Sequence, residues 1–124
     1  MTEYLGLHHA SVVVADLAAA LRFYVEVLGL ERDRSRPEMS FPGAWLKAGA
    51  QQIHLLELPN CDPVTGRPAH AGRDRHTALI VTGLDAVEQR LEAAGTGFTR
   101  SRSGRRALFC RDPDGNGIEL IEQC

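Results

Sequence analysis

The spacing of apolar and polar positions repeats in the same order in the two halves of the chain. Each half opens with a histidine, a β-branched apolar run and a leucine eight positions after the histidine, namely HASVVVADL from His9 and HTALIVTGL from His76. Short β-branched runs are typical of strands. We therefore expect the chain to contain two copies of one folding unit.

A helix is predicted after each of these strands, because the apolar positions then follow a spacing of three and four residues. The first series is bounded by Asp16, a good N-cap, and Gly29, a good stop. The second begins beside Asp85 and ends at Gly95. The apolar positions are Leu17, Leu21, Tyr24 and Leu28 in the first half, and Leu84, Val87, Leu91 and Ala94 in the second.

Three strands are predicted after each helix, over residues 30–34, 44–48 and 52–58, and again over 97–100, 106–111 and 117–122. The result is an α+β chain of two tandem βαβββ modules. We place module 1 at 5–58 and module 2 at 74–123, within one domain covering 1–124. Residues 59–73 contain several Pro and Gly residues and are predicted to be the linker.

The amino-acid composition adds little to the prediction of fold or function. The chain has 124 residues, 44% hydrophobic and 24% charged, with a net charge of −2. This composition is typical of a globular domain, and the charge gives no support for nucleic-acid binding. Apolar runs are too short for a membrane span, no export signal is seen, and the three cysteines form no CxxC motif. Reduced thiols in the cytoplasm are therefore expected.

Candidate ligands for a metal ion fall at equivalent positions in the two modules. His9 and His54 are separated by 45 residues, and His76 and Glu119 by 43. Strand alternation puts each of them at the head of an apolar stripe, which we expect to face inward. An unpaired buried imidazole or carboxylate is costly, and one shared cation would remove that cost.

Three imidazoles and one carboxylate suit a borderline divalent ion such as Zn, Ni, Co, Mn or Fe. The absence of thiolates in the set disfavours a closed structural zinc site, so a catalytic ion with open positions is expected. Taken singly, each residue has a simpler interpretation as a hydrogen-bonded strand side chain. Two other histidines are left out of the set: His8 alternates to the other face, and His70 lies in the Pro/Gly-rich linker and should be solvated.

Four segments together resemble the vicinal oxygen chelate superfamily, which includes glyoxalase I, extradiol dioxygenases, fosfomycin-resistance thiol transferases and bleomycin-resistance proteins. The segments are HASVVVADL from His9, RFY…LGL from Arg22, HTALIV from His76 and DPDGNGIEL from Asp112. The chain is most similar to glyoxalase-like single-domain members.

The resemblance implies paired βαβββ modules that form a half-open barrel around a divalent metal ion. It carries the family's ligand positions onto His9, His54, His76 and Glu119. It also implies a homodimer, in which the ligands of one site can come from one chain or from two. His54 departs from bacterial glyoxalase I, which has a glutamate at this position.

By this resemblance the chain is a glyoxalase-like enzyme, an isomerase or lyase that acts on a small oxygenated metabolite through a metal-chelated enediolate or oxyanion. Glu119 is the candidate base, with a metal-bound hydroxide as the competitor. Two alternatives remain open. One is an extradiol-type dioxygenase or fosfomycin-type thiol transferase, and the other is a non-catalytic small-molecule binding or resistance protein.

Weaker candidates for substrate contact are aromatic or cationic. Trp45 and Phe109 are candidates for an apolar pocket wall, and Arg36, Arg102 and Arg105 for binding an anionic group. Arginine forks bind carboxylates and phosphates well. The competing interpretations are ordinary core aromatics and a solvated arginine-rich hairpin over residues 100–106.

Overall fold

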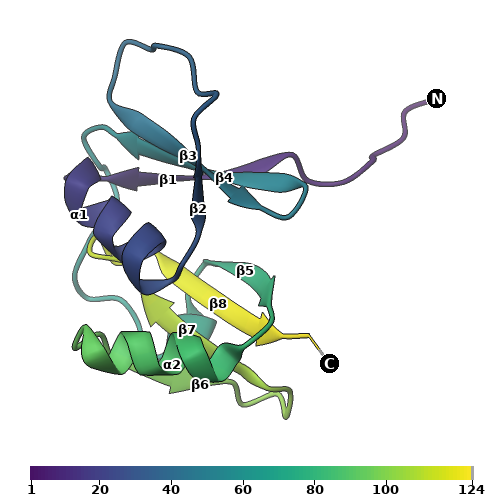
Figure 1. Cartoon of the computed structure of the whole chain (residues 1–124), viewed down its shortest axis with the longest axis vertical. Coiled ribbons are helices and arrows are strands. Elements are labelled where there is room, and N and C mark those ends of the chain that lie inside the picture. The colour runs from purple at the N-terminus through teal and green to yellow at the C-terminus, as the bar shows by residue number, and fades with distance from the viewer. Residues whose placement is uncertain (124) are drawn as a thin grey trace.

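The computed structural model describes residues 1–123 and has the predicted α+β architecture, with two four-stranded sheets. Figure 1 shows the sheet of the first half above that of the second, with the first helix between them on one side. The N-terminal segment extends away from the body of the molecule (Figure 1). Each half follows the predicted βαβββ order.

The first half forms a sheet in the order β1-β4-β3-β2, in which β1 and β4 are parallel and the other pairs are antiparallel. A short α-helix continues directly into a π-helical segment, η1. The elements are β1 (His9–Val14), α1 (Leu17–Leu21), η1 (Arg22–Val27), β2 (Glu31–Asp33), β3 (Gly43–Ala48) and β4 (Gln51–Glu57).

The second half repeats this sheet as β5-β8-β7-β6, again with the first and last strands parallel. A 3₁₀ turn, η2, precedes it. The elements are η2 (Ala71–Arg73), β5 (His76–Val81), α2 (Leu84–Ala93), β6 (Phe98–Arg100), β7 (Ala107–Arg111) and β8 (Gly117–Glu122). The strands β1 and β5 each lie at the edge of their sheet.

The predicted boundaries of the first helix are confirmed. The Asp16 side chain accepts hydrogen bonds from the amides of Ala18 and Ala19, and Gly29 takes a φ of 82°, where a glycine has no steric penalty. The interior of the helix differs from a regular α-helix. The Leu28 amide bonds to the carbonyl of Phe23, five residues earlier, which widens the turn.

The core lies between the helices and the sheet faces that they cover. Side chains from both halves contribute to it, including Tyr24, Leu46, Leu91, Leu108 and Ile118. Phe23 and Tyr24 are both buried in this core. Among residues 1–123, no helix is both long and apolar enough to cross a membrane.

Two glutamates at the ends of the last strands have a role that the sequence did not indicate. Strand alternation places Glu57 and Glu122 on the face opposite to the candidate ligands His54 and Glu119. In the structure, a Glu57 carboxylate oxygen accepts from the Leu17 amide at 2.8 Å, and Glu122 accepts from the Leu84 amide at 3.2 Å. Each carboxylate therefore caps the N-terminus of its own module's helix.

A buried polar network joins the two halves. The Tyr24 hydroxyl donates to Asp112 over 2.6 Å, and Asn116 bridges Asp112 and the carbonyl of Val13. Asp114 accepts from the amide of Ala15. Burial, followed by the charge of Asp112, raises the pKa of Tyr24 well above its usual value, so the hydroxyl keeps its proton and donates. The turn after β7 thus anchors the end of β1.

Replacing Tyr24 with phenylalanine is expected to lower the free energy of unfolding by about 1–2 kcal/mol, because a buried carboxylate loses a charge-assisted hydrogen bond. Urea unfolding at neutral pH measures this loss. Tyr4→Phe is the matched control, since Tyr4 is 95% exposed and its replacement should change the free energy by less than about 0.5 kcal/mol. An equal effect of the two changes would contradict the role given to the network.

Candidate metal centre

The four predicted ligands lie in the structure as two pairs, one on each sheet. His9 and His54 contact each other on the β1–β4 side, and His76 and Glu119 on the β5–β8 side. Within residues 1–123, no group of three or more His, Cys, Asp or Glu side chains is arranged to hold a metal ion. One chain thus brings the candidates together two by two.

The second pair has the geometry of two ligands of one ion. His76 Nδ1 lies 2.8 Å from the carbonyl oxygen of Asp74, which can only accept, so Nδ1 carries the proton. In the neutral ring the lone pair is then on Nε2, which lies 3.2 Å from Glu119 Oε1. Two lone-pair donors at this distance need a proton or a cation between them.

A divalent ion fits this requirement. Bonds from such an ion to imidazole nitrogen and carboxylate oxygen are about 2.0–2.2 Å long, so two ligands at roughly a right angle are about 3 Å apart. A metal-bound histidine also normally donates its other ring N–H to a carbonyl or carboxylate, as His76 does to Asp74. The donor atoms of His76 and Glu119 therefore suit a borderline divalent metal.

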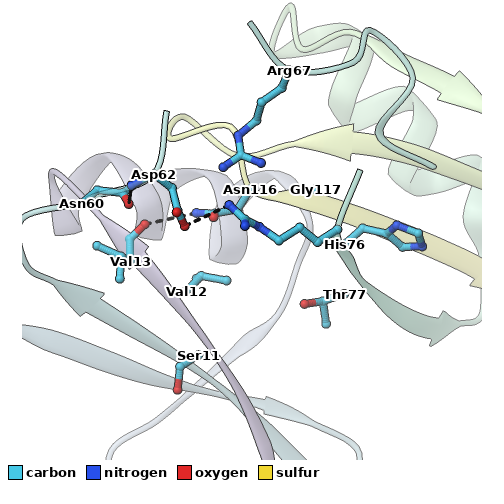
Figure 2. Close-up of a pocket in the computed structure, with 11 residues that line it drawn as sticks. Ser11, Val12, Val13, Asn60, Asp62, Arg67, His76, Thr77, Asn116 and Gly117 are labelled. Atoms are coloured by element: carbon cyan, nitrogen blue, oxygen red, sulfur yellow. Dashed lines mark hydrogen bonds and ion pairs between the residues drawn. The ribbon is translucent and has the colours of Figure 1, made fainter. Parts of the chain in front are cut away.

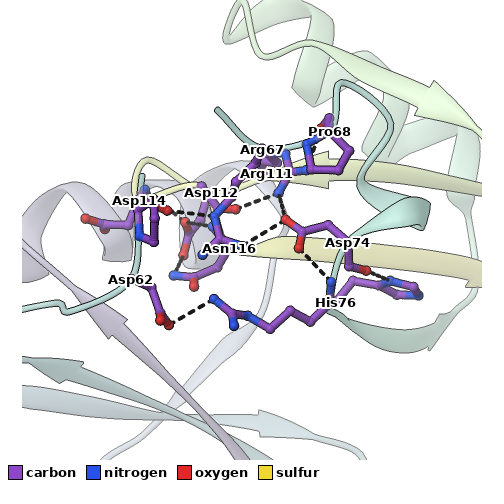
Figure 3. A network of polar contacts seen from close by, with 12 residues as sticks. Asp62, Arg67, Pro68, Asp74, His76, Arg111, Asp112, Asp114 and Asn116 are labelled. Atoms are coloured by element: carbon purple, nitrogen blue, oxygen red, sulfur yellow. Dashed lines mark hydrogen bonds and ion pairs between the residues drawn. The ribbon is translucent and has the colours of Figure 1, made fainter. Parts of the chain in front are cut away.

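A network of ion pairs holds Asp74 in place (Figure 3). Its Oδ2 accepts from Arg67 and Arg111, each at 2.9 Å. The hydrogen bond from Arg67, reinforced by that from Arg111, outweighs burial and lowers the pKa of Asp74 to about 2. Arg111 also donates to the carbonyls of Gly115 and Pro68. The backbone carbonyl that orients His76 is thus fixed by the linker and by β7.

The first pair is packed differently. The rings of His9 and His54 are stacked, with centroids 3.9 Å apart, and Trp45 stacks on the other face of His54 at 4.5 Å. His54 Nε2 donates to Gln52 Oε1, so the lone pair of the neutral ring is on Nδ1. Burial, followed by the neighbouring His9, lowers the pKa of His54, which favours the neutral ring that metals bind.

The nitrogen lone pairs of an imidazole lie in the plane of its ring. Because the His9 and His54 rings are stacked in nearly parallel planes, their lone pairs do not converge on one point. His9 is exposed, and its Nδ1 lies 2.8 Å from Nδ1 of His8. Joint ligation by the first pair therefore requires the His9 ring to turn, which its exposure permits.

The two aromatic candidates occupy equivalent positions. Trp45 is opposite His54 in the β3–β4 pairing, and Phe109 is opposite Glu119 in the β7–β8 pairing. The Phe109 ring meets the edges of His70 and His76, with centroid distances of 4.8 and 5.2 Å. Each aromatic side chain therefore packs directly against one candidate pair.

The three candidate arginines lie in different environments, and one of them contacts a candidate ligand. Arg105 donates to Glu119 Oε2 at 3.1 Å and so reaches the second pair. Arg36 instead donates to the carbonyl of Phe41 and stacks over that residue's ring, which ties down its own loop. Arg102 is exposed on the β6–β7 loop.

One linker residue, His70, lies in a different environment from the one predicted. His70 was expected to be solvated, but its ring is half-buried against Phe109, and its Nδ1 lies 2.6 Å from Thr99 Oγ1. The linker folds back through the turn η2, and Ala71 in that turn is buried. A 15-residue Pro/Gly-rich segment gives no periodic signal from which this return could be predicted.

A cavity of about 240 Å³ opens where β1 and β5 approach each other. Figure 2 shows Ser11, Val12 and Val13 on one side and His76 and Thr77 on the other, with the linker residue Asp62 at one end. Arg75 also lines the cavity. Of the four candidate ligands, His76 lines this space. The cavity therefore reaches His76 but is not lined by Glu119.

The open faces of the edge strands are not buried, contrary to the expectation of inward-facing stripes. His76, Ala78 and Ile80 alternate on the exposed side of β5, and Ile80 is 72% exposed. Leu79 and Val81 point the other way and pack on the core. The predicted alternation is confirmed, but this face is uncovered in a single chain.

Comparison with known proteins identifies the family. Residues 6–120 match the Glyoxalase/Bleomycin resistance protein/Dioxygenase superfamily. The chain is 32% identical over 120 residues to "Glyoxylase I 4" of Arabidopsis thaliana, covering 93% of this chain and 69% of that one. It is 31% identical to the uncharacterized protein YaeR of Escherichia coli strain K12, covering 94% and 95% of the two chains.

Solved structures agree with the fold. A glyoxalase family protein of Bacillus anthracis superposes with a TM-score of 0.77 and 27% identity over 100% of both chains. The sequence match spans more than nine-tenths of the chain and includes both modules. The chain therefore belongs to the glyoxalase/bleomycin resistance/dioxygenase superfamily.

Proposed function

We propose that this protein is a divalent-metal-dependent enzyme of glyoxalase type, with isomerase or lyase activity on a small, oxygenated, anionic metabolite. The observation that carries the proposal is the His76–Glu119 pair, in which the Asp74 carbonyl leaves the Nε2 lone pair facing a carboxylate oxygen 3.2 Å away. The similarity to "Glyoxylase I 4" supports the reaction class.

The complete ligand set in this proposal is His9, His54, His76 and Glu119, with each half-site provided by a different copy of the chain. In the described part of the chain the two pairs are not grouped around one point, and the exposed face of β5 that carries His76 is uncovered. A homodimer covers that face and brings the first pair of one chain to the second pair of the other. His9 and His54 of one chain and His76 and Glu119 of the other would then hold the ion.

The bound ion supplies Lewis-acid stabilisation of negative charge that develops on the substrate oxygens. Glu119 acts as the base: it takes a proton from the carbon next to a carbonyl group and returns it to a neighbouring atom. Asp74 holds the ring of His76 in the tautomer that presents Nε2. Phe109 and Trp45 exclude water beside the two pairs, and the arginines of the β6–β7 loop attract an anionic substrate.

A cytoplasmic location is consistent with the free thiols of two cysteines. Cys61 is exposed and Cys110 is buried, and both are free thiols. Burial raises the pKa of Cys110 to about 12, which keeps this thiol protonated and unreactive. Free thiols are typical of reducing compartments.

Metal analysis of protein purified without added metal is the decisive experiment, followed by a panel of hemithioacetals, catechols and fosfomycin. We expect about one nickel, zinc, cobalt or manganese ion per site, and turnover of a hemithioacetal or a related α-hydroxycarbonyl compound. Iron with catechol cleavage would indicate a dioxygenase. Failure to bind any of these ions under all loading conditions would overturn the metal centre and favour a binding protein.

A further inference from the structure

Arg105 is the residue whose position is least explained by ordinary surface solvation. It lies on the loop between β6 and β7, and its guanidinium donates to Glu119 Oε2 at 3.1 Å. The Glu119 side chain is only 3% exposed, whereas that of Arg105 is 57% exposed. A cationic head on an exposed side chain thus reaches inward to a buried carboxylate.

Without a metal ion, both oxygens of this carboxylate have partners. Oε1 faces His76, and Oε2 accepts from Arg105. A buried carboxylate that lacks such partners is strongly destabilising. The arginine therefore compensates the charge of Glu119 in the state that the structure shows.

An ion between His76 Nε2 and Glu119 Oε1 would leave Oε2 to Arg105, so two cations would share one carboxylate and their like charges would repel each other. The arginine is also easy to displace, because most of its side chain is already in water. Its loop includes Gly104 at a φ of 90°, and open space surrounds that glycine. Movement of the guanidinium into solvent on metal binding would disturb little of the core.

We propose that Arg105 is an electrostatic competitor of the metal ion: it stabilises the metal-free protein by pairing with Glu119, and it lowers the metal affinity because its charge repels an ion on the same carboxylate. The inference rests on the proposed function, because it requires Glu119 to be a ligand. It gives this arginine a role that does not depend on the substrate.

The test compares Arg105→Gln with Arg102→Gln, a matched control that removes the same charge from the same loop. Calorimetric titration of the metal-free proteins with Zn²⁺ or Mn²⁺ alone measures the dissociation constant. We expect Arg105→Gln to bind metal about five- to tenfold more tightly than Arg102→Gln, because the competing charge-assisted hydrogen bond is gone. Arg105→Lys, which keeps the charge, should bind like the wild type.

Thermal unfolding gives a second readout. In EDTA, Arg105→Gln should unfold at a lower temperature than Arg102→Gln, and saturating metal should raise its midpoint by more. Metal binding by Arg105→Gln that is equal to or weaker than that of Arg102→Gln would overturn this inference while leaving the metal centre intact. A wild-type protein that binds neither ion would overturn the metal centre itself and this inference with it.

Discussion

Replacing His76 with alanine is expected to abolish tight binding of a divalent metal ion. Its Nε2 is the only imidazole donor in the second pair, and the loss of residues that merely orient a ligand already weakens metal binding by about 10–100-fold. Loss of the ligand itself should therefore exceed about 100-fold. Titration of the metal-free protein, followed by metal analysis after dialysis, measures the change.

His8→Ala is the matched control for this experiment. His8 precedes β1 and its ring contacts that of His9, but strand alternation predicts that it is not a ligand. Its replacement should leave the metal affinity within a few-fold of the wild type. Equal losses from both variants would mean that the strand faces are assigned wrongly, and unchanged binding by His76→Ala would remove it from the ligand set.

Replacing Glu119 with glutamine should lower kcat/KM by about 10²–10⁴ on the substrate identified by the panel, measured at saturating metal. The amide has nearly the same shape but cannot accept the substrate proton, and it gives Arg105 and His76 no negative charge to pair with. Saturating metal separates the loss of the base from the loss of a ligand.

The comparison variant for Glu119 is Glu92→Gln, because Glu92 is exposed on α2. It removes the same charge at a distance from both pairs and should leave kcat/KM nearly unchanged. Should Glu119→Gln keep wild-type kcat/KM, the base must be another group, and a metal-bound hydroxide becomes the leading candidate.

Local signals in the sequence were sufficient to predict the elements and their order. Asp16 caps the first helix, Gly29 ends it, and the alternation along β5 separates His76 and Ile80 from Leu79 as expected. These features depend on contacts within a few residues, so hydrophobic periodicity and capping chemistry carry them. The repeat placed the candidate ligands at equivalent positions, and the structure brings them into contact as two pairs, one in each module.

Features that depend on contacts between distant segments could not be predicted. The widened turn at Leu28 and the stack of His9, His54 and Trp45 arise from packing across strands. Hydrophobic periodicity in the sequence does not indicate how one sheet lies against the other. The sequence therefore could not show that a single chain leaves its two ligand pairs apart.

The turn formed by residues 112–117 has a consequence for how the chain can vary. The equivalent turn of the first half is the tight hairpin between β3 and β4. In residues 1–123, no side-chain hydrogen bond joins that hairpin to the other module. By contrast, Asp112, Asp114 and Asn116 bond to Tyr24, Ala15 and Val13 of the first half. A substitution in this turn therefore disturbs both modules at once. We expect mutational drift to be tolerated in the β3–β4 hairpin and selected against here, so that two duplicated halves diverge at unequal rates.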